Sequence, residues 1–300
     1  MDIEKLVKYI RRRLMTEGKE RPPVNIMAAL LFGSWAQRAE TPDSDVDLLV
    51  VASNINPKRH RRGMEIADIT KCLPALSLDI LLYTKEEVIS NFRNHNPLFL
   101  DIAEEGIIIL DGEHFLQNLV SETRVYIKQK GIIKFGDGWI FPVEKGFPAF
   151  LSKVSNRDFS QAMLKDGERD CEIGKTLIEG KYYDKAVYHF QQSIEKSIKS
   201  ILIAKGVFQR THLIGRILRK VVSEKDIPKR MRKDLLEAAD ISEAIEPEVS
   251  LSRYPGIKDD SLWLPFKEYK KKDADGAMEK SAKVLSIAKR FLEDWFSNAS

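Results

Sequence analysis

The sequence of 300 residues predicts an α+β fold, in which a mixed sheet flanked by helices precedes an all-α antiparallel helical bundle. Short apolar runs separated by helical patterns fill the first 112 residues, as expected of a sheet with crossover helices. After residue 155, apolar residues recur at the spacing of long amphipathic helices. We therefore expect a first domain at 1–112, a connecting helix and linker at 113–154, and a helical domain at 155–300.

Composition is that of a globular protein, with 43% hydrophobic residues, enough for a core in each of two domains. The net charge of +4 neither requires nor excludes a nucleic-acid partner. Cys72 and Cys171 have no metal-ligand spacing and are expected to be reduced thiols of a cytoplasmic protein. The N-terminus lacks the apolar core of a signal peptide, and no apolar run approaches the ~18 to 20 residues of a membrane span.

The first domain is expected to alternate helices with strands. An amphipathic helix over residues 2–18 should end before the Pro22-Pro23 pair. Apolar runs predict strands at Asn25–Phe32, through Asp45 and Asp47 up to a turn at Ser53–Pro57, at Leu78–Tyr83 and at Ile107–Leu110. Helical spacing and a capping box predict helices at Lys58–Leu73, Thr84–Asn94 and from Pro97 to Gly106.

The rest of the chain is expected to be helical apart from the linker. A hairpin is expected around residues 136–138 (GDG), in a stretch whose aromatic side chains either clamp the domains together or stack on a base. From Asp158 onward we expect helices throughout, at Phe159–Glu179, Tyr183–Lys205, Leu213–Ser223, Pro228–Ile245 and Ala274–Trp295.

Three aspartates stand in apolar surroundings in the first domain. Asp45 and Asp47 are two residues apart, so on an extended strand they share a face, and a neighbouring strand at Leu78–Tyr83 would bring Asp79 beside them. Burying a lone carboxylate is unfavourable, which favours a cation between them, and oxygen ligands without His or Cys suit Mg²⁺ or Mn²⁺. The alternative is a pair of solvent-facing aspartates in a PDSD turn.

A candidate phosphate-binding turn follows the first strand, which ends at Gly33 and Ser34. Glycine lets backbone amides approach a ligand, and Ser34 is expected to cap a short helix over Trp35–Ala39 whose N-terminus would attract an anion. A phosphate group beside three metal-binding carboxylates indicates a nucleotide.

Residues 33–34 (GS), 45–48 (DVDL) and the later aspartate together resemble the motif of minimal nucleotidyltransferases of the DNA polymerase β superfamily, over roughly residues 20–112. The resemblance implies that Gly33 and Ser34 bind the nucleotide, and Ser44 is a further candidate nucleotide-binding residue. The resemblance also implies that Asp45, Asp47 and Asp79 are the catalytic, metal-binding acids, and that the last of them activates the acceptor hydroxyl.

Two positions depart from that motif. Close relatives tend to have an arginine directly after Gly-Ser and a glycine four residues after the serine, where this chain has Trp35 and Arg38. A basic cluster at residues 58–62 (KRHRR) would either face the triphosphate or an anionic acceptor, or form a solvated first helical turn.

The second half resembles the HEPN family (higher eukaryotes and prokaryotes nucleotide-binding) over roughly residues 155–297. The resemblance rests on the helix YYDKAVYHFQQSIEKSIKSILIAKG, followed by THL at 211–213 and SRYPG at 252–256. Many members are metal-independent ribonucleases with an Arg and a His at a short spacing on one helix, which is absent after Arg253 and disfavours that activity. His189 is expected to pack or hydrogen-bond within the bundle, and His212 to help fix a helix start. The fused arrangement also resembles kanamycin nucleotidyltransferase.

These features predict a nucleotidyltransferase that moves an NMP, by default AMP from ATP, onto a hydroxyl acceptor and releases pyrophosphate. Mg²⁺ (or Mn²⁺) is the expected cofactor, and the acceptor is a protein or a small molecule, with an RNA end less favoured. The alternative is a catalytically weak nucleotide-binding regulatory or interaction protein of the toxin–antitoxin type. No membrane partner is expected, and the helical domain could support a homo-oligomer.

Overall fold

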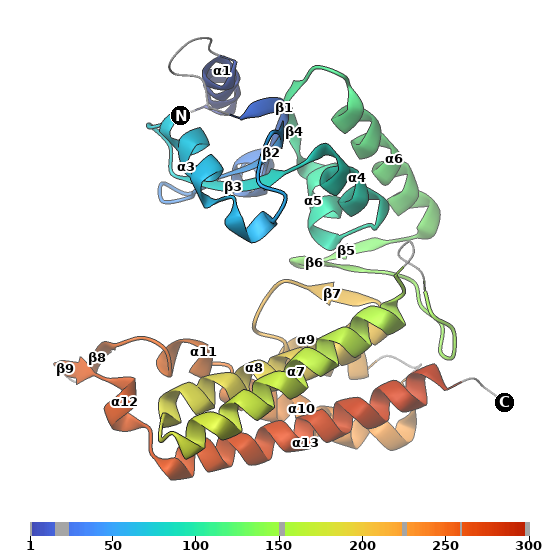
Figure 1. Ribbon diagram of the computed structural model, residues 1–300. Coiled ribbons are helices and arrows are strands. Elements are labelled where there is room, and N and C mark those ends of the chain that lie inside the picture. The colour runs from blue at the N-terminus through green and yellow to red at the C-terminus, as the bar shows by residue number, and fades with distance from the viewer. Residues whose placement is uncertain (1, 16–23, 150–153, 224–226, 259, 298–300) are drawn as a thin grey trace. The chain divides into compact units, whose positions relative to one another are not determined.

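The computed structural model describes residues 2–15, 24–149, 154–223, 227–258 and 260–297. Contacts within the chain divide it into two compact units, Met1–Gly131 and Ile132–Ser300. Figure 1 labels the helices and strands of both units. None of the described helices is both long enough and apolar enough to cross a membrane.

The first unit is built on a mixed sheet with the strand order β3-β2-β1-β4. β1 is antiparallel to β2 and to β4, whereas β2 and β3 are parallel (Figure 1). A parallel pair needs a crossover, and the chain supplies it through α3 (Gly63–Lys71). The strands are β1 (Asn25–Phe32), β2 (Val46–Ser53), β3 (Leu78–Tyr83) and β4 (Ile107–Asp111).

Helices cover both faces of this sheet, which is why β2 is apolar without alternation. Leu48 and Val50 of β2 pack in one core cluster with residues of α1 (Ile3–Leu14), whereas Leu49 and Val51 pack in the other. A strand buried on both faces carries apolar residues at successive positions. The second cluster is covered by α4 (Lys85–Arg93), α5 (Pro97–Glu105) and α6 (Phe115–Lys130).

Two segments of the first unit differ from the sequence prediction. The single helix expected at Lys58–Leu73 is divided into a 3-10 turn at Arg59–Arg61 and α3. The division falls at Arg62, whose side chain is 1% exposed and turns into the protein. Helix α6, which the sequence placed in the connector, contributes apolar residues to the core of the first unit. The capping box predicted at Thr84 is present and begins α4.

The second unit is an antiparallel bundle around α8, whose apolar stripe is buried against α7 and α13 (Figure 1). Phe190, Ile194 and Ile198 of that stripe have no exposed surface. The helices are α7 (Asn156–Glu179), α8 (Tyr183–Ala204), α9 (Gly215–Val222), α10 (Lys229–Ile245), α11 (Glu248–Leu251), α12 (Pro265–Glu268) and α13 (Lys271–Phe296).

The expectation that the chain is helical throughout after Asp158 is wrong at two places. β7 (Val207–Gln209) joins the predicted hairpin of β5 (Ile133–Phe135) and β6 (Gly138–Ile140) as a third strand. A further hairpin is formed by β8 and β9, at Gly256–Lys258 and Ser261–Trp263. Strands of three residues are too short to show a period of two, and β7 forms only because a distant segment pairs with it.

Candidate functional site

Asp47 and Asp79 are direct neighbours in the sheet. They are paired residues in the parallel register of β2 and β3. Neighbouring strands lie about 4.8 Å apart, and paired residues project from the same face of the sheet. The structure therefore brings these two carboxylates together, on the face that also carries Leu49 and Val51.

Gly33 lies against the carboxylate of Asp47 and leaves no room for a side chain. Its φ is +70°, in the region that favours glycine. A Cβ atom placed on Gly33 would lie 2.0 Å from Oδ2 of Asp47. On the other edge of β2, Asp47 pairs with Phe32, the last residue of β1. The turn after β1 thus brings a backbone segment directly beside the acid.

The predicted N-cap role of Ser34 is wrong. Helix α2 runs from Gly33 to Gln37, and its N-cap is Phe32, which makes no side-chain cap hydrogen bond. Because Phe32 is extended and the chain turns at Gly33, Ser34 falls inside the first helical turn. The predicted contact between Ser34 and the nucleotide does not depend on a capping role and stays a prediction.

The two departures from the family motif have different structural consequences. Arg38 ends α2 with a φ of +56°, so the backbone keeps a conformation suited to glycine although the residue is arginine. Trp35 donates a hydrogen bond from its indole nitrogen to the carbonyl oxygen of Ser44, at 3.3 Å. This bond ties α2 to the residue that precedes Asp45.

Asp45 lies just before β2 rather than within it, and its side chain is exposed. The hydroxyl of Ser77 donates a hydrogen bond to its carboxylate, and the backbone nitrogen of Val46 donates to the carbonyl oxygen of Ser77 at 2.8 Å. Ser77 was missed from the sequence, although its position two residues before Asp79 places it on the same face. We call Asp45, Asp47, Asp79 and Ser77 the acid edge. It contains two neighbouring contacts between the segments, Asp45 with Ser77 and Asp47 with Asp79.

Ser44 shapes the turn that leads into the acid edge. Its hydroxyl oxygen accepts a hydrogen bond from the backbone nitrogen of Thr41 at 2.8 Å, and lies 3.0 Å from the Thr41 hydroxyl. Its backbone nitrogen donates to the carbonyl oxygen of Thr41. The turn on which the alternative of solvent-facing aspartates rests is therefore present, and Asp45 follows it as an exposed residue, whereas Asp47 is half-buried on β2. A nucleotide contact by Ser44 remains a prediction.

The donor set of the acid edge suits Mg²⁺ combined with substrate phosphates. Within the described part of the chain, no group of three or more His, Cys, Asp or Glu side chains is placed so that it could hold a metal ion. Asp45 and Asp79 form no ion pair with a described residue. Mg²⁺ in proteins is commonly bound by one or two carboxylates together with substrate phosphates. The adjacent carboxylates of Asp47 and Asp79 fit that arrangement.

The basic cluster lies at the other end of the strands. The guanidinium carbon of Arg59 is 4.4 Å from the ring centroid of Tyr83, the last residue of β3. Asp79 is four residues earlier, roughly 13 Å away at the rise of about 3.3 Å per residue in a strand. The cluster is thus separated from the acid edge by most of the length of β3.

Arg62 is a structural member of that cluster. It donates to both carboxylate oxygens of Glu87, at 2.6 and 2.9 Å, and to the carbonyl oxygens of Leu82 and Asn56. Burial raises the pKa of Glu87, but the hydrogen bonds from Arg62 and from the Thr84 backbone outweigh it and hold that pKa below its ordinary value. This pair fixes the segment between β2 and α3.

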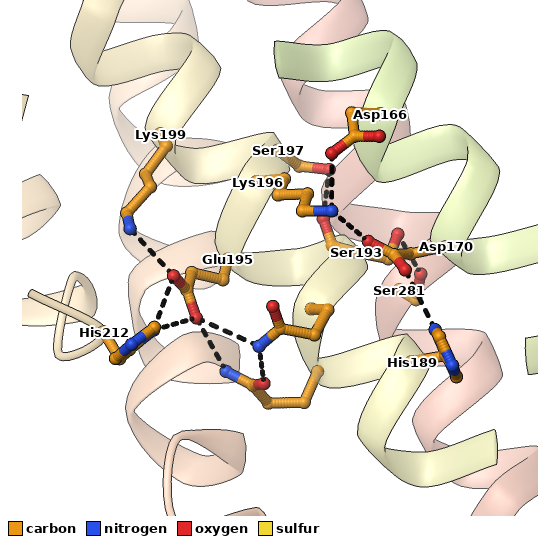
Figure 2. Close-up of polar contacts among 12 residues, drawn as sticks. Asp166, Asp170, His189, Ser193, Glu195, Lys196, Ser197, Lys199, His212 and Ser281 are labelled. Atoms are coloured by element: carbon orange, nitrogen blue, oxygen red, sulfur yellow. Dashed lines mark hydrogen bonds and ion pairs between the residues drawn. The ribbon is translucent and has the colours of Figure 1, made fainter. Parts of the chain in front are cut away.

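Two of the buried acids of the second unit, Glu195 and Asp170, lie on or beside α8, as Figure 2 shows. Glu195 is 4% exposed and accepts hydrogen bonds from Lys199 at 2.8 Å and from Gln191 at 3.2 Å. Nδ1 of His212 lies 2.9 Å from the same carboxylate. The expected part of His212 in fixing a helix start is not found, because α9 begins at Gly215 without a side-chain cap and His212 contacts Glu195 instead.

A second buried acid is Asp170 of α7, which faces two residues of α8 (Figure 2). Its carboxylate lies 2.9 Å from Nδ1 of His189 and accepts a hydrogen bond from Lys196 at 2.6 Å. The predicted hydrogen bonding of His189 within the bundle is confirmed. Burial lowers the pKa of Lys196, but its hydrogen bonds to Asp166 and Asp170 outweigh this effect and raise it. The polar residues that mark this helix in sequence are thus mutually satisfied.

Comparison with known families and proteins matches both halves of the chain. The family model described as HEPN domain matches residues 160–291, and the one described as Polymerase beta, Nucleotidyltransferase matches residues 15–114. Two proteins of Methanocaldococcus jannaschii are similar. "Putative toxin MJ1304" is 32% identical over 139 residues, which cover 46% of this chain and 91% of that protein. "Putative protein adenylyltransferase MJ1305" is 28% identical over 127 residues, which cover 42% and 86%.

A solved structure, that of ST0689, an archaeal HEPN homologue, is 25% identical to the chain with a TM-score of 0.34. The match covers 44% of this chain and 97% of that structure.

Proposed function

The chain belongs to the HEPN family and carries a polymerase β nucleotidyltransferase domain ahead of its HEPN domain, and from this we propose that it transfers AMP from ATP to a protein hydroxyl. The observation that carries the proposal is the cross-strand pair of Asp47 and Asp79 beside the turn at Gly33. Similarity to MJ1305, whose name proposes a protein adenylyltransferase, supports ATP as the donor and a protein as the acceptor.

In this proposal the acid edge and the first residues of α2 both bind the nucleotide. The backbone at Gly33 and Ser34 binds the triphosphate, because the turn lies against Asp47 and has no side chain at its closest point. Asp45, Asp47 and Asp79 are the residues that would hold Mg²⁺. When bound, Mg²⁺ neutralises charge on the phosphates and supports in-line displacement.

Asp79 is proposed as the residue that handles the acceptor. It is exposed, whereas Asp47 is half-buried against the turn, so an incoming hydroxyl reaches Asp79 more readily. Asp79 orients that hydroxyl and takes its proton. The hydroxyl oxygen forms a bond to the α-phosphorus of ATP as the bond from that phosphorus to the pyrophosphate oxygen breaks. The products are an AMP-modified hydroxyl and pyrophosphate, which keeps the electron pair.

A second candidate function is nucleotide-dependent regulation of the toxin–antitoxin type with weak or absent transfer. It is favoured by Trp35 and Arg38, which replace residues typical of the phosphate-binding turn, and by similarity to a protein named as a toxin. A pure binder has no chemical need for three acids on one sheet edge, so the acids favour transfer. A cytoplasmic location and a homo-oligomer formed by the helical domain are further parts of the proposal.

The test is transfer of label from α-labelled ATP with Mg²⁺ and cell extract. The natural chain is compared with Asp45→Asn/Asp47→Asn and with Asp43→Asn, which changes an exposed aspartate of the same turn. We expect protein labelling by the natural chain and the control, and at least about 10³-fold less by the double variant. Labelling that is equal in all three, or absent from all, would contradict the transferase proposal.

Calorimetry of the same three proteins separates the two candidate functions. If no protein is labelled but Mg²⁺-dependent ATP binding is lost in the double variant, the regulatory function is supported instead.

A further inference from the structure

A strongly basic surface stands apart from the acid edge. Lys58, Arg59, His60 and Arg61 are consecutive, all exposed, and join β2 to α3 as the 3-10 turn and the residue before it. We call these four residues the basic turn. None of them forms an ion pair with a residue that the structure describes.

The basic turn is held in one conformation by the residues around it. The backbone nitrogen of Lys58 donates to Oδ1 of Asn56 at 2.9 Å, and the backbone nitrogen of Asn56 donates to Glu65 at 2.8 Å. Arg62 anchors the end of the turn on Glu87. The two nearby acids are therefore engaged in shaping the turn. Arg59 interacts with Tyr83 and with Glu87, whereas the other three residues of the basic turn have no acid partner among the described residues.

This arrangement opposes local stability. Cations immediately before a helix repel the positive end of the helix dipole, and the basic turn precedes the N-terminus of α3. Neighbouring like charges add further repulsion. Residues that lower local stability, without a stabilising contact in return, are expected at functional sites such as ligand-binding surfaces.

The ligand of the basic turn is distinct from the nucleotide of the acid edge. Tyr83, which Arg59 covers, is roughly 13 Å along β3 from Asp79, at about 3.3 Å per residue. A triphosphate bound beside Gly33 lies at the acid end of the sheet. The partner of the basic turn is therefore a separate anionic molecule or a remote part of a large one.

We propose that the basic turn binds the phosphodiester backbone of a nucleic-acid strand. A 3-10 helix rises about 2 Å per residue, so it concentrates its cations within a few ångströms. Nucleic acids have a comparable density of negative charge, with one phosphate charge per about 1.7 Å along the axis of duplex DNA. Acidic residues on protein surfaces are usually interspersed with cations and match the turn less well.

The residue types support the same partner. Arginine binds phosphate through two parallel hydrogen bonds, and the turn carries two arginines. Arg59 already stacks on Tyr83 with one face and is exposed, and guanidinium planes stack on unpaired bases. The role goes beyond the proposed transfer and does not depend on it, because binding can be measured in a chain that transfers no nucleotide.

The test is fluorescence anisotropy of the full chain with labelled oligonucleotides of about 20 residues, as single-stranded RNA, single-stranded DNA and duplex. The variant is Lys58→Gln/Arg61→Gln, which leaves Arg59 on Tyr83. The control is Lys128→Gln/Lys130→Gln in the last turn of α6, which removes the same charge from exposed positions. Thermal unfolding verifies that all three proteins are folded.

We expect the variant to bind about tenfold more weakly near 0.1 M salt, and the slope of its salt dependence to fall by about 0.7 for each single-strand phosphate that it no longer binds. The control should change affinity less than twofold. Binding to all three oligonucleotides supports contact with the backbone alone, and binding to single strands only supports added stacking. No binding by the natural chain, an equal loss in the control, or competition by polyglutamate as strong as by RNA at equal charge overturns the proposal.

Discussion

Two acids of the acid edge and two buried acids of the bundle differ in exposure and in their protein partners. Asp45 and Asp79 are exposed and form no ion pair with a described residue, whereas Glu195 and Asp170 are buried and each contacts a lysine and a histidine. In the bundle the protein itself neutralises the acids, which fixes helices in place. At the sheet edge, Asp45 and Asp79 have no such cation among the described residues, and in our proposal a bound ligand supplies the opposite charge.

The largest effect predicted from this comparison is on the stability of the bundle. Glu195→Ala leaves the half-buried ammonium of Lys199 and the buried amide of Gln191 without this acceptor, so we expect a loss of about 3–5 kcal/mol in the free energy of unfolding. Glu195→Gln, which keeps the shape, should lose less. Urea denaturation measures both. A Glu195→Ala chain that keeps its stability but loses nucleotide transfer would contradict the structural role assigned to Glu195.

The next largest effect concerns the turn beside Asp47. Gly33→Ala would place a Cβ atom 2.0 Å from Oδ2 of Asp47 and strain a φ of +70°, so the acid must move. A displacement of about 1 Å at a reacting centre can reduce the rate about 10²-fold, and we expect a loss of that size in labelling rate. Gly63→Ala is the control, because a Cβ there meets nothing within 4 Å. Equal labelling rates of the two variants would show that the close approach of Gly33 to the Asp47 carboxylate is not needed for transfer.

A smaller effect on stability is expected from Glu87, an acid of the first unit that forms an ion pair with Arg62. Arg62 and the Thr84 backbone overcome the effect of burial and lower the folded-state pKa of Glu87. Such a group stabilises the fold above its unfolded pKa of about 4.3, and this contribution is lost as pH falls through the lower folded value. Glu87→Gln should therefore flatten the decline of stability below pH ~4.5.

Urea midpoints between pH ~3 and ~6 measure that decline. The Arg62 pairing has no stabilising role if the natural chain and Glu87→Gln decline in parallel.

Much of the fold could be predicted because the first unit consists of apolar runs bounded by turns. The strands Asn25–Phe32 and Leu78–Tyr83 have the predicted bounds, and the two acid-bearing strands are adjacent. β7 could not be predicted, because its pairing partner is about seventy residues away in the chain, as for Gly138 with Gln209.

The side-chain partners were harder to predict than the acids themselves. Asp47 and Glu195 both interrupt apolar patterns, and only the fold shows that His212, 17 residues away, reaches Glu195. Ser34 was misplaced as a cap because the turn at Gly33 starts α2 earlier than propensity indicates. The sequence located charged residues in apolar surroundings, but only the geometry separates the acids that are paired within the bundle from the exposed acids at the sheet edge.

The central claim is that the acid edge supports transfer of a nucleotidyl group. The most direct measurement uses parallel reactions with ATP labelled at the α- or the γ-phosphorus, for the natural chain, Asp47→Asn and Asp43→Asn. We predict label in protein only from α-labelled ATP, unchanged by Asp43→Asn and at least about 10³-fold lower with Asp47→Asn. Label from γ-labelled ATP, or α-label that persists in Asp47→Asn, would contradict the account.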